Sequence, residues 1–439
     1  MKNITKSAYG AIDSLTAPIL MLLATPIFLN YLGIEGYATW VLINSIIASL
    51  SLFNFGGTDV VVKFVSSNRG VNSKNSTREV FGTVFSFQLI VLLAIYVLFL
   101  IIEPIVSQNI ASSNLLTFMS ILYVAIPVFL IKQLEQLLYA FFRGYEQFGH
   151  TVIISSISKI LFFLTQILIA ISTKSVTDVF YGALAVSVLL FLAQALYIKI
   201  IHRDDISFSD ANIRTARSLL SFGGWNWLSS VTSMLTIQSD KWLVSGLLSL
   251  KTFGIYSIGV LIFNQLRAVV GTSFYWVFPE ISKDNLNKKI LAKKYWKLLF
   301  YVCIVSLFIS ISLSNLSGLF QLWLGDRAYQ DSQYYINTFL LLFPLFTLNI
   351  ISHLYLLGLG LAKQKFFADV VSLSAKLITI YLVISVFNVK EWVLFFMVFI
   401  AIEFIAYAVI ISKNLPIRLV FLILFLLLQM AIVFIRLLA

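Results

Sequence analysis

Four basic residues lie inside long apolar runs of the chain: Lys132, Lys159, Arg267 and Lys376. An ionised side chain at membrane depth costs about 2.5–3.5 kcal/mol on insertion scales, so it normally faces a partner or a watery cavity. Phosphate and pyrophosphate suit such groups, because arginine presents a fork to two oxygens and lysine a mobile point charge. We therefore interpret these four residues as candidates for binding an anionic solute.

Acidic residues in the same runs allow a purely structural reading of these charges. Glu135 follows Lys132 by three residues on one helix face and can neutralise it. Asp240 and Glu403 can do the same for the basic residues of the second half. These three carboxylates are also the candidates for binding a coupling ion, either a proton or sodium. Asp369, near a helix end, is expected to be solvated or paired at the membrane interface.

The elements that carry these charges are predicted from hydropathy. Hydrophobic residues make up 60% of the chain, charged residues 11%, and the mean hydropathy is +0.95. Such a composition belongs to integral membrane proteins, and runs of about 20 apolar residues match a bilayer core. We predict an all-α membrane protein with twelve core spans at residues 9–32, 36–57, 80–102, 114–142, 150–172, 176–200, 218–246, 252–280, 295–318, 333–358, 365–388 and 391–412. A last run, 416–438, is either a thirteenth span or a helix lying in the membrane.

The second half of the chain repeats the plan of the first at an offset of about 216 residues. Residues 31–40 fall on residues 247–256, Gly144 falls on Gly360, and Lys159 falls within one residue of Lys376. Six spans per repeat return the chain to its starting side, so the repeats are parallel. We predict two six-helix lobes around a central cavity.

The repeat also predicts the domain organisation. The loop 202–217 is polar, carries mixed charges and joins the lobes on the cytoplasmic side. The four parts are an N-terminal lobe at 1–201, this loop at 202–217, a C-terminal lobe at 218–412, and an extra hydrophobic helix within 413–439.

The net charge of +12 is an orientation signal. If the N-terminus is cytoplasmic, most lysines and arginines fall on inside segments, as the positive-inside rule requires. The basic inner face suits anionic lipid headgroups, and we expect no nucleic-acid partner. The expected location is the cytoplasmic (inner) membrane, with the N-terminus inside.

Several enzyme signatures are missing from the chain. It has no G-x-x-x-x-G-K-[ST] loop, no G-x-S-x-G elbow and no H-E-x-x-H motif. The three histidines show no metal-ligand spacing. We expect no enzyme activity, cofactor or metal, so transport must use an ion gradient, the substrate gradient or a partner.

Several motifs together resemble one membrane family. They are residues 31–40, residues 53–59 with Lys63, residues 142–147, and residues 240–242 with 254–256. Over about residues 5–412 the chain resembles Wzx-type polysaccharide flippases of the MOP (MATE-like) superfamily. The resemblance implies two lobes in a V and a basic cavity for an undecaprenyl-pyrophosphate-linked oligosaccharide. It also implies flipping from the inner to the outer leaflet of a bacterial membrane, an ion gradient as driver, and glycan polymerase machinery as a partner.

Two alternatives are weighed against this reading. A drug or cation exporter of the same superfamily predicts acidic residues dominating the cavity, whereas basic residues dominate here. A membrane polymerase or ligase of the same glycan pathway needs a sizeable outside loop with catalytic basic residues. The longest outside loop, about 319–332, holds only Arg327.

Overall fold

A computed structural model describes residues 2–50, 53, 57–69, 74–109, 113–202, 231–274, 277–281, 287–386 and 391–438. All regular structure within these residues is helical. Lipid offers backbone groups no hydrogen-bond partner, and a helix satisfies those groups within itself. Among the described helices, eleven are long and apolar enough to cross a membrane. The prediction of an all-helical, multi-pass membrane protein is confirmed.

The chain forms two compact units, Met1–Ser230 and Val231–Ala439. Apart from His202, the predicted loop at 202–217 lies outside the described residues.

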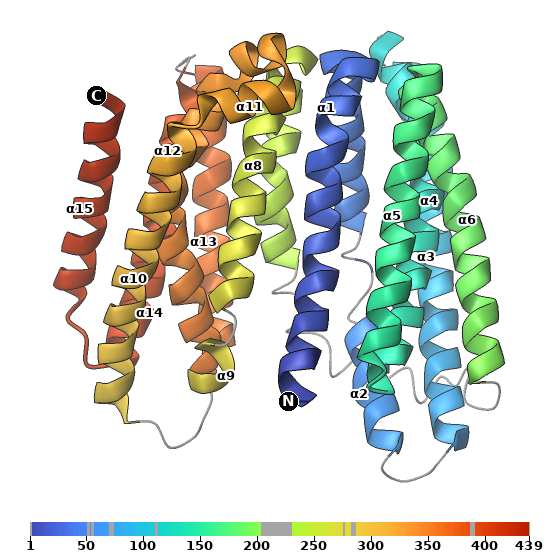
Figure 1. Ribbon diagram of the computed structural model, residues 1–439, viewed down its shortest axis with the longest axis horizontal. Helices are drawn as coiled ribbons and strands as arrows, with labels where there is room; N and C mark the ends of the chain where they lie inside the picture. The colour runs from blue at the N-terminus through green and yellow to red at the C-terminus, as the bar shows by residue number, and fades with distance from the viewer. Residues whose placement is uncertain are drawn as a thin grey trace. The chain divides into compact units, whose positions relative to one another are not determined.

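The first unit contains six labelled helices (Figure 1). They are α1 (Lys2–Leu50), α2 (Gly57–Arg69), α3 (Lys74–Asn109), α4 (Ser113–Gly144), α5 (Phe148–Thr173) and α6 (Val176–Ile201).

Helix α1 has two arms that meet at Gly33. This residue has φ 72° and ψ 174°, a conformation that favours glycine. Phe28 and Trp40 would stand roughly 18 Å apart along a straight helix. Their ring centroids are instead 4.8 Å apart, so the chain reverses direction between them. Figure 1 shows both arms. The separate predicted runs 9–32 and 36–57 correspond to these arms.

The second unit begins with a helix over residues 231–247. It continues with α8 (Leu250–Phe274), α9 (Val277–Ile281), α10 (Lys288–Ser314), α11 (Ser317–Leu324), α12 (Asp326–Gly358), α13 (Ala362–Tyr381), the π-helical turn η2 (Leu382–Val386), the 3-10 turn η3 (Trp392–Phe395), α14 (Phe396–Asn414) and α15 (Leu419–Leu438).

One helix forms the centre of each unit. In the most apolar window of each candidate span, 72% of the residues of α4 and 78% of those of α12 are buried, against at most 56% in the other described spans. Helix α4 is the fourth predicted run of the first half, and α12 is the fourth of the second. The two halves therefore also agree in which of their helices is the most buried.

The turns that follow α4 and α12 share one backbone pattern. Glu146 (φ 57°) and Gly360 (φ 73°) are both left-handed, and the surrounding backbone hydrogen bonds match at an offset of 214 residues. Lys159 lies eleven residues after the start of α5, whereas Lys376 lies fourteen after the start of α13. The predicted equivalence of these two lysines is therefore wrong by three residues. They lie on matching helices, at positions that differ by about one turn along the helix.

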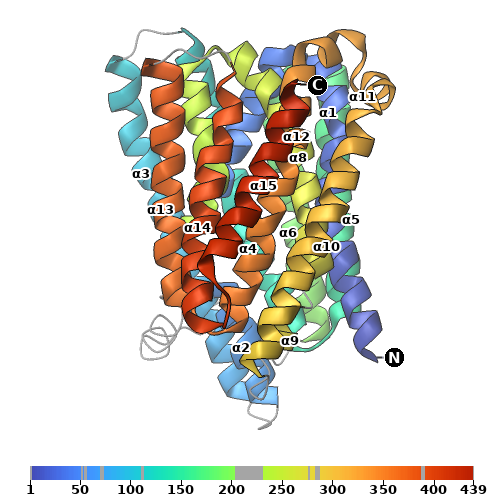
Figure 2. The ribbon, with the colours of Figure 1, turned by 90° about the vertical axis from the view of Figure 1, so that its left-hand side faces the viewer.

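Helix α15 packs along the second unit and runs parallel to α10 (Figure 2). The ring of Phe425 lies 5.9 Å from that of Trp296, near the start of α10. At the other end, Arg436 donates a 2.8 Å hydrogen bond to Ser310. The last predicted run is thus a helix that follows a membrane-spanning neighbour and is itself long enough to cross.

Candidate functional site

A small pocket lies inside the second unit, between the helix over residues 231–247, α8, α12, α13 and α14. Two of the four predicted basic residues, Arg267 and Lys376, line it together with Asp240 and Asn264. Its volume is about 40 Å³, enough for a few water molecules or one ionic group. The remaining wall is mostly apolar, and it includes the aromatic residues Phe263, Phe339, Phe346, Phe396 and Phe399.

Arg267 is positioned by the close packing of α8 on α12. A Cβ at Gly259 would lie 3.0 Å from the backbone carbon of Tyr335, so a glycine allows the two helices to approach. One turn further along α8, Phe263 contacts Phe346 with ring centroids 5.0 Å apart. The next turn places the Arg267 guanidinium 4.7 Å from the centroid of the same Phe346 ring. Gly259, Phe263 and Arg267 thus lie on one face of α8, and this face places the cation of Arg267 against an aromatic ring within an apolar wall.

Arg267 has no acidic neighbour at ion-pair distance. Across the part of the chain that the structure describes, no carboxylate oxygen lies within 4.0 Å of its guanidinium. An arginine in such surroundings remains charged, because the guanidinium group is not deprotonated in proteins. The group therefore keeps its charge and its fork of donors available for an anion.

Lys376, by contrast, is neutralised within the same pocket. Its Nζ lies 2.6 Å from Oδ1 of Asp240 and also donates to the carbonyl of Thr236. Tyr256 of α8 donates to the second oxygen of Asp240 over 2.6 Å. The predicted pairing of Asp240 with a basic residue is confirmed, and Lys376 is the partner.

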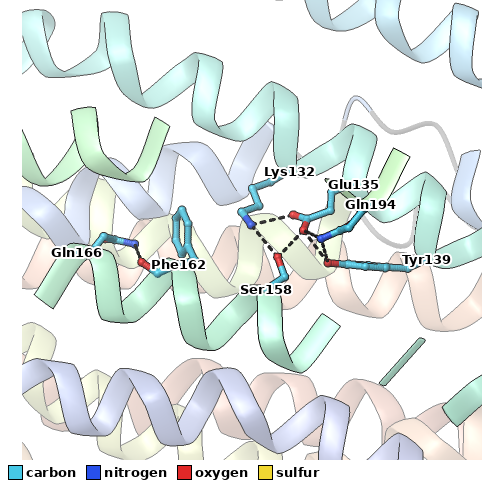
Figure 3. Close-up of polar contacts among 7 residues, drawn as sticks. All are labelled: Lys132, Glu135, Tyr139, Ser158, Phe162, Gln166 and Gln194. Carbon is cyan, nitrogen blue, oxygen red and sulfur yellow. Dashed lines mark hydrogen bonds and ion pairs between the residues drawn. The ribbon is translucent and has the colours of Figure 1, made fainter. Parts of the chain in front are cut away.

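The corresponding charges of the first unit form a closed polar network (Figure 3). Lys132 and Glu135 of α4 form an ion pair of 2.8 Å, so the predicted pairing of these two residues is confirmed. Glu135 is 1% exposed and also accepts hydrogen bonds from Tyr139, Ser158 and Gln194. With four donors from α4, α5 and α6 around it, this carboxylate ties three helices together. Its contacts favour a structural role over ion coupling.

Lys159 is half-buried on α5, in the first unit. It does not line the pocket of the second unit, and neither does Lys132. That Lys159, Arg267 and Lys376 line one water-filled space between the lobes, with Lys132 close to it, remains a prediction.

Glu403 of α14 belongs to a second polar chain in the C-terminal unit. Asn349 of α12 donates to one of its oxygens over 2.8 Å, and the Tyr407 hydroxyl lies 3.1 Å from the other. The same hydroxyl lies 2.5 Å from Oδ1 of Asp369, whose Oδ2 is 2.5 Å from Nζ of Lys365.

Sequence reasoning missed most of this chain of contacts. Asp369 is paired, as expected, but it is 6% exposed and Lys365 is 1% exposed, so neither is solvated at a membrane interface. The spacing of four residues, from Lys365 to Asp369 and from Glu403 to Tyr407, places each pair on one helix face. This spacing was the sequence signal from which these two contacts could have been predicted.

Comparisons with known proteins agree with this fold. A family model described as polysaccharide biosynthesis protein matches residues 46–330. A putative O-antigen transporter of Shigella flexneri is 25% identical over 382 residues, covering 83% of this chain and 86% of that protein.

Two solved structures show the same fold at low sequence identity. One is an inward-facing multidrug resistance MATE family transporter of the MOP superfamily, with TM-score 0.68, 15% identity, and coverage of 94% of this chain and 98% of that one. Another is a MOP superfamily transporter from Pyrococcus furiosus, with TM-score 0.61, 13% identity, and coverage of 98% and 96%.

These likenesses define a multi-pass membrane protein with a MATE-like fold. The MATE-like match implies the predicted twelve-helix, two-lobe arrangement, and the described residues contain eleven candidate spans. The chain belongs to the polysaccharide biosynthesis protein family. The resemblance to MOP-superfamily polysaccharide transporters is thereby confirmed.

Proposed function

We propose that this protein is a flippase for an undecaprenyl-pyrophosphate-linked oligosaccharide repeat unit. It moves this anionic substrate from the inner to the outer leaflet of the bacterial cytoplasmic membrane by alternating access, coupled to an ion gradient. Its family and fold are those of transporters, and it is not an enzyme. The polar loops with most of the basic residues, and the N-terminus, face the cytoplasm.

The observation that supports an anionic substrate is Arg267. A pyrophosphate crossing the bilayer needs its charge compensated where Coulomb interactions are far stronger than in water. Arg267 offers two donors in one plane and has no carboxylate within 4.0 Å among the described residues. A pocket of about 40 Å³ accommodates part of an ionic headgroup and no sugar, so the glycan must lie outside it.

The name of the Shigella relative and the family description both support a glycan substrate. A drug or cation exporter would share the MATE-like fold but should carry an unpaired acid in its pocket. The acid of this pocket, Asp240, is instead neutralised by Lys376. Lys159 and Lys132 complete the proposed set of substrate-binding cations. Glycan polymerase machinery is the proposed partner on the outer side.

A chromosomal deletion in the native organism tests this function. We expect the surface glycan to be lost and its lipid-linked repeat unit to accumulate in membrane extracts, with both restored by the plasmid-borne wild-type chain. Unchanged surface glycan combined with increased sensitivity to cationic drugs would contradict the proposal and favour an exporter.

A further inference from the structure

Glu403, which is half-buried, differs in its neighbours from the three buried carboxylates. Glu135, Asp240 and Asp369 each have a lysine nitrogen within 2.8 Å. No basic nitrogen lies within 4.0 Å of Glu403 in the described part of the chain, and its two hydrogen-bond partners there, Asn349 and Tyr407, are neutral. Glu403 is half-buried, and withdrawing a carboxylate from water without a cation beside it makes the ionised form costly.

The number of protons available for hydrogen bonds indicates how the charge of Glu403 is neutralised. The Tyr407 hydroxyl has one proton but lies 2.5 Å from Asp369 and 3.1 Å from Glu403. It can donate to only one of two carboxylates, so the other contact requires a proton on the acid itself. Lys365 lies 2.5 Å from Asp369 and balances its negative charge, whereas Glu403 has no such cation among the described residues. The second proton therefore belongs to Glu403.

We infer that Glu403 binds the proton that couples transport, and that the Tyr407 oxygen accepts the hydrogen bond from this protonated acid. The acid donates to the Tyr407 oxygen, Tyr407 donates to Asp369, and Asn349 donates to the remaining oxygen of Glu403. The amide oxygen of Asn349, a residue only 3% exposed, has no hydrogen-bond partner among the described residues. This buried oxygen leaves one hydrogen-bonding position unfilled in the amide that contacts the acid.

The surrounding groups define how the proton can move. Arg267 of α8 and Asp369 of α13 act on Glu403 electrostatically, with Tyr407 on its own helix. His353 of α12 interacts with Arg267 and with Lys365. If the Glu403 proton passes to the Tyr407 oxygen while the Tyr407 proton passes to Asp369, the net result is transfer of one proton from Glu403 to Asp369. No other reactant is needed.

This inference rests on the proposed function for its role in transport, but its proton can be observed separately. We would record infrared spectra of the full-length protein in lipid vesicles at neutral pH, in H₂O and D₂O. The wild type should show the C=O stretch of a protonated carboxylic acid, shifted in D₂O. Glu403→Gln should remove this band, because glutamine has no carboxylic acid group. The variant should still fold, because glutamine preserves the shape and hydrogen bonds of the neutral acid. Glu135→Gln is the matched control and should leave the band in place.

Tyr407→Phe provides a second variant in case Glu403→Gln does not fold. Loss of the hydroxyl acceptor should shift the frequency of the band without removing it. Absence of the band in the wild type, its persistence in Glu403→Gln, or an unshifted band in Tyr407→Phe would overturn the assignment.

The coupling role is tested in cells that lack the chromosomal gene. Glu403→Gln should reduce surface glycan at least tenfold at a normal protein level. Wild-type glycan from a variant that has lost the band would overturn the coupling role. Failure of the proposed function itself would be visible earlier, as unchanged glycan on deletion of the whole gene.

Discussion

Lys376 and Asp240 form a 2.6 Å ion pair between α13 and the helix over residues 231–247. Each side chain is 6% exposed, and the pair lies in the wall of the pocket that also contains Arg267. Because Lys376 is already balanced by Asp240, binding of an anion at Lys376 requires this pair to loosen. Arg267 needs no such rearrangement.

Lys376→Met should lower the amount of folded protein, since removing one partner of a buried pair costs about 3–5 kcal/mol. The double variant Lys376→Met with Asp240→Asn should recover the protein level, measured by immunoblot of membrane fractions and by thermal unfolding in detergent. We expect the recovered protein to give less surface glycan than the wild type. Full recovery of glycan would show that Lys376 acts only in folding.

Tyr139→Phe should destabilise the first unit without affecting the pocket of the second. The hydroxyl donates a 2.7 Å hydrogen bond to the buried Glu135, and a bond to a charged group contributes about 1.5–3 kcal/mol. Thermal unfolding in detergent measures the loss. Tyr181→Phe on α6 removes a hydroxyl from a side chain that is 57% exposed, and it should leave the unfolding temperature unchanged. Equal effects of the two substitutions would contradict the network's structural role.

Gly259→Ala should push α8 away from α12 and displace Arg267 from Phe346. The added methyl group would lie 2.9 Å from the Phe339 ring and 3.0 Å from the Tyr335 backbone. Surface glycan should fall several-fold. Gly271→Ala, on the same helix, meets nothing within 4 Å and should retain glycan. Normal glycan from Gly259→Ala would show that the distance between these helices does not matter for transport.

A reporter fused after residue 439 should give a signal on the outer side of the membrane. Helix α15 runs parallel to α10, which starts at the basic segment beginning with Lys288 and Lys289. If that segment is cytoplasmic, as the positive-inside rule predicts, the C-terminus must be outside. A fusion at residue 210 should report the cytoplasm. The same side for both fusions would contradict either the span of α15 or the predicted orientation.

Much of the fold follows from local sequence patterns. Apolar runs predict the helices because each run must satisfy its backbone within lipid, and Lys132–Glu135 was predictable from its spacing of three residues. The Lys376–Asp240 pair joins residues 136 positions apart, so only the packed bundle selects that partner. A difference of a few residues in a turn changes the offset between the two halves, although the order of helices stays the same. The offset of 214 at Glu146 and Gly360 was therefore not visible from matched residues alone.

The polar chain from Lys365 to Glu403 illustrates a further limit. Sequence places Asp369 near a helix end, where hydration is the ordinary outcome. Its burial depends on α14, which presents Tyr407 to it over 2.5 Å. A hydrogen bond between two helices cannot be deduced from the periodicity of either one.

The most direct test of the account is surface glycan in Arg267 variants, normalised to the amount of transporter in the membrane. Arg267→Ala should reduce the amount of surface glycan at least tenfold at a normal protein level. Arg267→Lys should retain only part of the wild-type glycan, because lysine lacks the planar fork. Arg327→Ala, an exposed arginine at the start of α12, is the matched control and should retain wild-type glycan. Wild-type glycan from Arg267→Ala would contradict the claim that this arginine carries the anionic headgroup.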